Sequence, residues 1–123
     1  MAVAKLQLFA FDGPDPRGLA EFYARILGWE IEAEHGDDSW VTLLNPDGRG
    51  HIAFQYAEEY APPIWPGAKR PQQAHLDLEV DDLDEGERAV LGIGARKHEH
   101  QPAPESFRVY LDPVGHPFCL VLS

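Results

Sequence analysis

The chain has 123 residues, 44% of them hydrophobic and 25% charged, with a formal net charge of −11 at pH 7. The length suits one globular domain, and the strong negative charge argues against binding to nucleic acid or to anionic membranes, which both need clustered Lys and Arg. Cys119 is the only cysteine, which excludes an intrachain disulfide. Since no stretch approaches the roughly 20 apolar residues of a membrane span, and no signal-peptide pattern is present, we expect a cytoplasmic protein.

The first half of the chain predicts one helix among short strands. Asp15 is typical of an N-cap and Pro16 of a first helical residue. Apolar residues then recur at helical spacing until Gly28, which is typical of a helix end. A turn at residues 45–48 separates the last two strands. We expect strands over residues 5–11, 29–33, 40–44 and 51–56.

Residues 58–73 contain four prolines. Proline has no backbone N–H and disrupts both helices and central strands. We therefore expect this segment to be a linker or a cover.

The second half repeats the pattern of the first. Asp82 predicts a helix start and Gly94 a helix end, with strands over residues 74–80, 95–99, 107–111 and 117–122. Thirty residues separate Asp15 from Asn45, and thirty separate Asp82 from Asp112. The sequence therefore predicts one α+β domain, residues 1–123, with two βαβββ modules at about 1–57 and 74–123, joined by the linker 58–73. A single ferredoxin-like sheet with additions is the alternative.

Three segments carry a family resemblance. Residues 15–29 are similar to the first-helix signature of the vicinal oxygen chelate superfamily, residues 75–82 to the opening strand of its second module, and residues 112–118 to its final hairpin. The chain thus resembles glyoxalase-like proteins of the glyoxalase/bleomycin resistance/dioxygenase superfamily. The resemblance implies two modules whose sheets curl as a mixed sheet around a concave cleft, and it implies a homodimer.

Metal-using members of this superfamily take ligands from four cleft positions, which correspond here to Leu8, Gln55, His75 and Cys119. Strand alternation also places these four residues away from the helices. Leu8 cannot bind a metal, and the remaining three are a poor set for a divalent cation. We expect no metal or other cofactor; if a metal binds, Gln55, His75 and Cys119 are the candidate ligands.

His75 and Asp77 are the candidate catalytic residues, because a His-x-Asp pair on one strand face could act as a base and its neighbour. The alternative is that they are hydrogen-bonded polar residues on a solvated face. Cys119 fits a small buried apolar residue better than a reactive thiol. His98 and His100 have a chelating spacing, but their polar neighbours favour a solvated edge.

Aromatic residues suggest a site for an organic ligand. Trp65 lies in a stiff Pro-rich stretch that could place its indole over the cleft, although it could also fill a module junction or a dimer contact. The candidate ligand-binding residues are Leu8, Trp40, Gln55, Trp65, His75, Asp77, Tyr110 and Cys119.

Three functions remain open. The first is a protein that binds a small, partly aromatic molecule without turning it over. The second is a metal-dependent or His-based lyase, isomerase or dioxygenase, and the third is a module whose cleft is filled by side chains or by a neighbouring chain.

Overall fold

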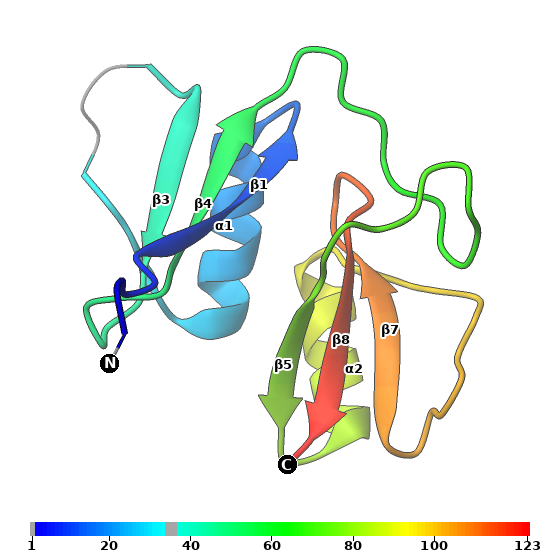
Figure 1. Ribbon diagram of the computed structural model, residues 1–123. Coiled ribbons are helices and arrows are strands. Elements are labelled where there is room, and N and C mark those ends of the chain that lie inside the picture. Colours follow the sequence, from blue (N-terminus) through cyan, green and yellow to red (C-terminus); the bar gives the residue numbers. More distant parts are fainter. Residues whose placement is uncertain (1, 34–36) are drawn as a thin grey trace. The chain divides into compact units, whose positions relative to one another are not determined.

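Each half of the chain folds into a four-stranded mixed sheet with one helix. Figure 1 shows the helix of each half lying against its strands. The computed structural model describes residues 2–33 and 37–123. The chain divides into two compact units, Met1–Tyr60 and Ala61–Ser123. Within the described residues, no helix is long and apolar enough to cross a membrane.

The first unit contains helix α1 and a sheet with the strand order β1-β4-β3-β2. Strand β1 runs parallel to β4, and the other neighbours are antiparallel. The elements are β1 (Leu8–Gly13), α1 (Pro16–Leu27), β2 (Glu30–Ile31), β3 (Trp40–Leu44) and β4 (His51–Tyr56).

The second unit has the same topology, with the strand order β5-β8-β7-β6 and β5 parallel to β8. Most corresponding strands agree in length: β3 and β7 have five residues each and β4 and β8 have six, whereas β1 has six and β5 has five. The elements are β5 (Leu76–Val80), α2 (Leu83–Ile93), β6 (Arg96–Lys97), β7 (Phe107–Leu111) and β8 (Pro117–Leu122). The predicted pair of βαβββ modules is therefore confirmed.

The two helices begin where the sequence predicts. The carboxylate of Asp15 accepts a hydrogen bond from the backbone N–H of Gly18 at 3.1 Å, and that of Asp82 accepts one from Glu85 at 3.0 Å. Each bond satisfies a backbone donor that the first helical turn leaves free. Gly28 ends α1 with a φ of +73°, a conformation that favours glycine.

The helices bury their apolar faces on one side of each sheet. In the first unit the ring of Tyr23 stacks on Phe54, with 5.7 Å between the centroids. In the second unit α2 approaches the sheet closely at Gly86, where a Cβ atom would lie 3.1 Å from Leu120 and 3.2 Å from Val80. Burial of such side chains contributes roughly 1.5–3 kcal/mol each. In the part of the chain that the structure describes, no helix of the same unit covers the opposite face of each sheet, which we call its open face.

Several predicted strands are shorter than expected. Strands β2 and β6 have two residues each, and each lies at the edge of its sheet. Strand β1 begins at Leu8, and β5 begins at Leu76, so His75 precedes the strand. Phe9 is 44% exposed on the edge strand β1.

Most of the proline-rich segment packs within the second unit. The N–H of Ile64 donates to the carbonyl of Arg70 at 2.6 Å, and the Arg70 guanidinium donates to the carbonyl of Pro62 at 3.0 Å. Pro62 also lies against Gly115, where a Cβ atom would come within 2.7 Å of the proline ring. The segment from residue 61 onward is thus a folded part of this unit, and the linker predicted for residues 58–73 is shorter than expected.

Candidate functional site

The open face of the second sheet carries a pocket of about 380 Å³. Strand β8 is central in this face, and Cys119 pairs with Asp77 of β5 on one side and with Val109 of β7 on the other. Because side chains alternate along a strand, these three project from the same face of the sheet. The pocket is lined by Trp65, Gln72, His75, Asp77, Phe107, Val109, Pro117, Cys119 and Val121.

Three polar side chains converge at the pocket. Nε2 of His75 lies 3.0 Å from Oδ1 of Asp77, and both side chains are accessible, with 39% and 61% of their surfaces exposed. Cys119 is buried. Burial, followed by the charge of Asp77 and a hydrogen bond to it, raises the pKa of the Cys119 thiol to about 11. The thiol is therefore protonated at neutral pH, which makes it a poor nucleophile.

Gln72 adds a polar atom that lacks a partner. Its Oε1 is buried and has no hydrogen-bond donor among the residues that the structure describes. A buried acceptor without a donor costs about 1–3 kcal/mol. A donor on a ligand or a water molecule would remove that cost.

Trp65 forms a wall of the pocket and is held by two imidazoles. Its ring centroid lies 5.3 Å from that of His98 and 5.2 Å from that of His100, with the planes tilted by 63° and 66°. Nδ1 of His98 accepts a hydrogen bond from the backbone N–H of His100 at 2.9 Å. The two histidines follow the edge strand β6, where His100 is exposed as expected, and both contact the tryptophan.

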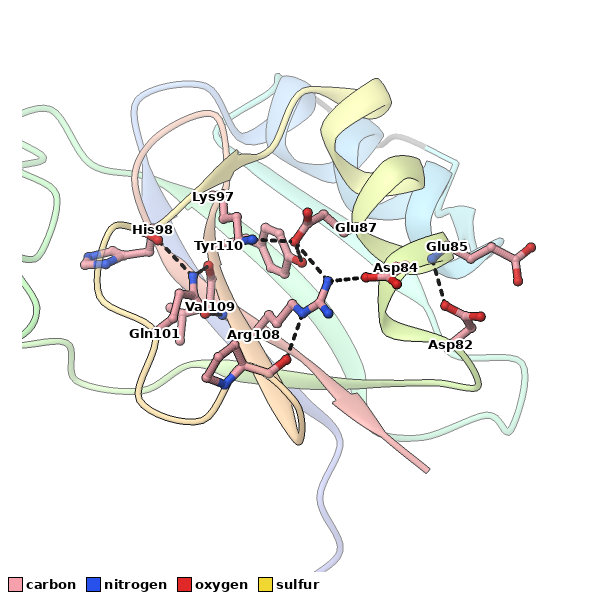
Figure 2. A network of polar contacts seen from close by, with 11 residues as sticks. Asp82, Asp84, Glu85, Glu87, Lys97, His98, Gln101, Arg108, Val109 and Tyr110 are labelled. Atoms are coloured by element: carbon pink, nitrogen blue, oxygen red, sulfur yellow. Dashed lines mark hydrogen bonds and ion pairs between the residues drawn. The ribbon is translucent and has the colours of Figure 1, made fainter.

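Gln101 ties the histidine loop to strand β7, as Figure 2 shows. Its amide donates to the carbonyls of His98 and Val109, both at 2.8 Å. Its carbonyl accepts from the N–H of Val109 at 2.9 Å. Val109 lines the pocket and His98 contacts Trp65, so Gln101 links the loop that contacts Trp65 to a residue of the pocket wall.

Three predicted site residues belong to the first unit. Trp40 pairs with Gln55 across β3 and β4, and strand alternation places both, with Leu8, on the open face of that sheet. The indole N–H of Trp40 donates to Oγ1 of Thr42 at 2.9 Å. Of the other predicted residues, the structure brings Trp65, His75, Asp77 and Cys119 together in the pocket of the second unit.

Tyr110 does not lie with the pocket residues, which corrects the prediction. It is fully buried on the helix side of the sheet, where its hydroxyl donates to Oε1 of Glu87 at 2.9 Å (Figure 2). The reason is strand alternation: Val109 faces the pocket, so the next residue faces α2. Burial, and then the bond to Glu87, raises the pKa of Tyr110 well above its ordinary value.

Five lining residues were not predicted from the sequence. Val109 and Val121 could have been found, because strand alternation and pairing place them beside Cys119 and Phe107. Nothing in the sequence pattern pointed to Gln72, since it lies outside the strands. The missed residues are Gln72, Phe107, Val109, Pro117 and Val121.

The second unit contains a possible set of metal ligands. The four-position set of the superfamily is not reproduced, because Leu8 offers no ligand atom. Within the second unit, His75, Asp77 and Cys119 each offer one ligand atom, and these atoms lie within 4.8 Å of one another. Asp77 thus joins the candidates in place of Gln55, which belongs to the first unit. Three protein ligands are the usual number in catalytic zinc sites, but here the thiol would first have to lose its proton.

Solved structures of the same fold cover nearly the whole chain. A glyoxalase/bleomycin resistance protein/dioxygenase family enzyme from Burkholderia phytofirmans PsJN matches with a TM-score of 0.73 and 16% identity, over 97% of this chain and 98% of the other. A possible glyoxalase from Bacillus cereus matches with a TM-score of 0.69 and 13% identity, over 98% and 99%. TnmS3, an antibiotic-binding protein from Streptomyces sp. CB03234, matches with a TM-score of 0.61 and 19% identity, over 99% and 98%.

Sequence comparison gives the family. No curated protein sequence matches this chain. The family model of the glyoxalase-like domain matches residues 8–121, which is nearly the full length. The resemblance inferred from the three sequence segments is confirmed, and the chain belongs to the glyoxalase-like domain family.

Proposed function

We propose that this protein binds a small, partly aromatic organic molecule in the pocket of its second unit. The observation that carries the proposal is the pocket itself, about 380 Å³ in volume, with mostly apolar walls and a few polar groups at His75, Asp77 and Gln72. Sites for small organic ligands usually combine apolar walls with a few placed polar groups in this way. Trp65 supplies an aromatic surface at the wall.

The relatives support binding of small molecules in general terms. One similar structure is that of an antibiotic-binding protein, and another is an oxidase. We propose binding without a resident metal, because the protonated thiol of Cys119 and the apolar Leu8 both weaken the superfamily's ligand set. We also expect a homodimer in the cytoplasm; light scattering would measure the mass.

Two neighbouring residues of β8 allow a matched test. Val121 lines the pocket, whereas the next residue, Leu122, is 44% exposed and projects from the opposite face. A panel of aromatic compounds and antibiotics would be screened by calorimetry against the wild-type protein, Val121→Trp and Leu122→Trp. We expect a ligand that binds the wild type and Leu122→Trp but is excluded from Val121→Trp, where the indole fills the pocket. Unchanged binding by Val121→Trp would contradict the proposed site.

A metal-dependent or His-based enzyme is the second candidate, favoured by the cluster of His75, Asp77 and Cys119. Elemental analysis of protein purified without chelators separates the two candidates. We expect no stoichiometric metal. Stoichiometric zinc, nickel, iron or manganese that is lost in Cys119→Ser and His75→Ala would favour the enzyme. For a metal-free enzyme, unchanged turnover by His75→Ala would exclude His75 as the base.

A further inference from the structure

We propose that the pocket selects an aromatic ligand that carries a protonated amine or a similar N–H donor, and that it rejects carboxylates. This inference rests on the proposed binding function and specifies the class of ligand. Its basis is the set of polar atoms that the pocket offers.

The polar groups favour a donor on the ligand. Oε1 of Gln72 is buried without a donor among the described residues, so it is an acceptor in need of an N–H or O–H. The Asp77 carboxylate has about four lone-pair sites. His75 and the Cys119 thiol each contact this carboxylate, but its side chain remains 61% exposed. Asp77 can therefore accept a further hydrogen bond from a ligand.

The charged residues of the pocket lining also favour a cationic ligand. Among the lining residues that the structure describes, there is no lysine or arginine, and Asp77 is the carboxylate of the set. A carboxylate in the pocket would meet Asp77 without a lysine or arginine of the described lining to offset it, whereas an ammonium would pair with Asp77.

Trp65 adds attraction for the same class of ligand. The indole face is the best aromatic partner for a cation, and it also stacks with other rings. His98 and His100 contact the indole and hold it in the wall. A ring with a short cationic arm could contact Trp65 and Asp77 at once.

Three compounds with the same indole ring and a short arm test the selectivity: tryptamine is a cation, tryptophol is neutral and indolepropionate is an anion. Binding would be followed by heteronuclear NMR at one fixed pH for all three compounds. We expect tryptamine to bind about tenfold more tightly than tryptophol, with shifts at Val109 and Cys119, and indolepropionate to bind least.

Asp77→Asn should lower the affinity for tryptamine about tenfold, to that of the wild type for tryptophol, because the charge that pairs with the ammonium is lost. Glu79→Gln is the matched control, because Glu79 lies two residues further along the same strand face but does not line the pocket. Salt offers a test on the wild type: added sodium chloride should weaken tryptamine binding and leave tryptophol binding unchanged.

The outcomes separate the two proposals. Equal binding of tryptamine and tryptophol at the pocket residues would overturn the selectivity but leave the binding function intact. Tighter binding of indolepropionate would also overturn the selectivity. If none of the three compounds shifts the pocket residues, both the selectivity and the proposed binding of aromatic molecules fail.

Discussion

The hydroxyl of Tyr110 donates a hydrogen bond to Oε1 of Glu87 at 2.9 Å and so joins strand β7 to helix α2. The same oxygen lies 3.0 Å from Nζ of Lys97 and 3.3 Å from a guanidinium nitrogen of Arg108. Arg108 also contacts Asp84 at 2.9 Å (Figure 2). This network lies on the face of the sheet opposite to the pocket, so we expect its residues to affect stability more than binding.

Tyr110→Phe should lower the free energy of unfolding by about 1–2 kcal/mol, because a hydrogen bond to a charged acceptor is lost in a buried position. Urea denaturation would measure the change. Tyr56→Phe is the control, since Tyr56 is 49% exposed, and should stay within about 0.5 kcal/mol of the wild type. A Tyr110→Phe protein as stable as this control would show that the bond contributes nothing.

Glu87 should make stability depend on pH in the acid range. Burial alone would raise the pKa of Glu87, but hydrogen bonds from Lys97 and Tyr110 and the charges of Lys97 and Arg108 outweigh it and hold the pKa below its ordinary value of 4.5. A lowered pKa stabilises the fold above the ordinary value, and this contribution is lost as the pH falls through the folded-state value.

Denaturation of the wild type and Glu87→Gln across the acid range would measure this dependence. The wild type should be the more stable at neutral pH, and the difference should shrink below pH 4.5. Glu85→Gln, an exposed change in the same helix, is the control and should show no such convergence. If the difference in stability between the wild type and Glu87→Gln stayed constant with pH, the pKa of Glu87 would not be lowered in the folded protein.

Cys119 should react slowly with iodoacetamide. A rise of its pKa from 9.0 to about 11 lowers the thiolate fraction at neutral pH about a hundredfold. Mass spectrometry of the native protein would follow alkylation, with the urea-unfolded protein as the reference. Asp77→Asn should speed the reaction, because the charge of Asp77 raises this pKa. If the native and unfolded proteins were alkylated at the same rate, neither burial nor the contact with Asp77 would protect the Cys119 thiol.

Gln101→Leu should loosen the loop that supports Trp65. Three hydrogen bonds to His98 and Val109 are lost, so we expect a loss of about 1–3 kcal/mol in stability. Hydrogen exchange at the Val109 amide should become faster, and the affinity for any pocket ligand should fall. Gln73→Leu, an exposed change, is the control. Unchanged exchange at Val109 would show that Gln101 does not hold the loop to the sheet.

The sequence by itself determined the duplicated fold. The N-caps at Asp15 and Asp82, the helix ends at Gly28 and Gly94, and the matching spacing of the two halves are local features, so they can be read without tertiary contacts. Strand alternation also predicted that His75, Asp77 and Cys119 share a face. The same rule would have placed Tyr110 under the helix, had it been applied to β7.

Only the tertiary structure decided which residues enclose the pocket. Trp65 and Gln72 come from the proline-rich segment, and the histidines that support Trp65 come from a loop after β6. Neither segment has a periodic pattern, so its position depends on contacts with residues outside the segment, such as those of Pro62 with Gly115 and of Gln101 with Val109. The pKa of Cys119 depends on the same packing, because burial against its neighbours and the approach of Asp77 arise only when the strands pair.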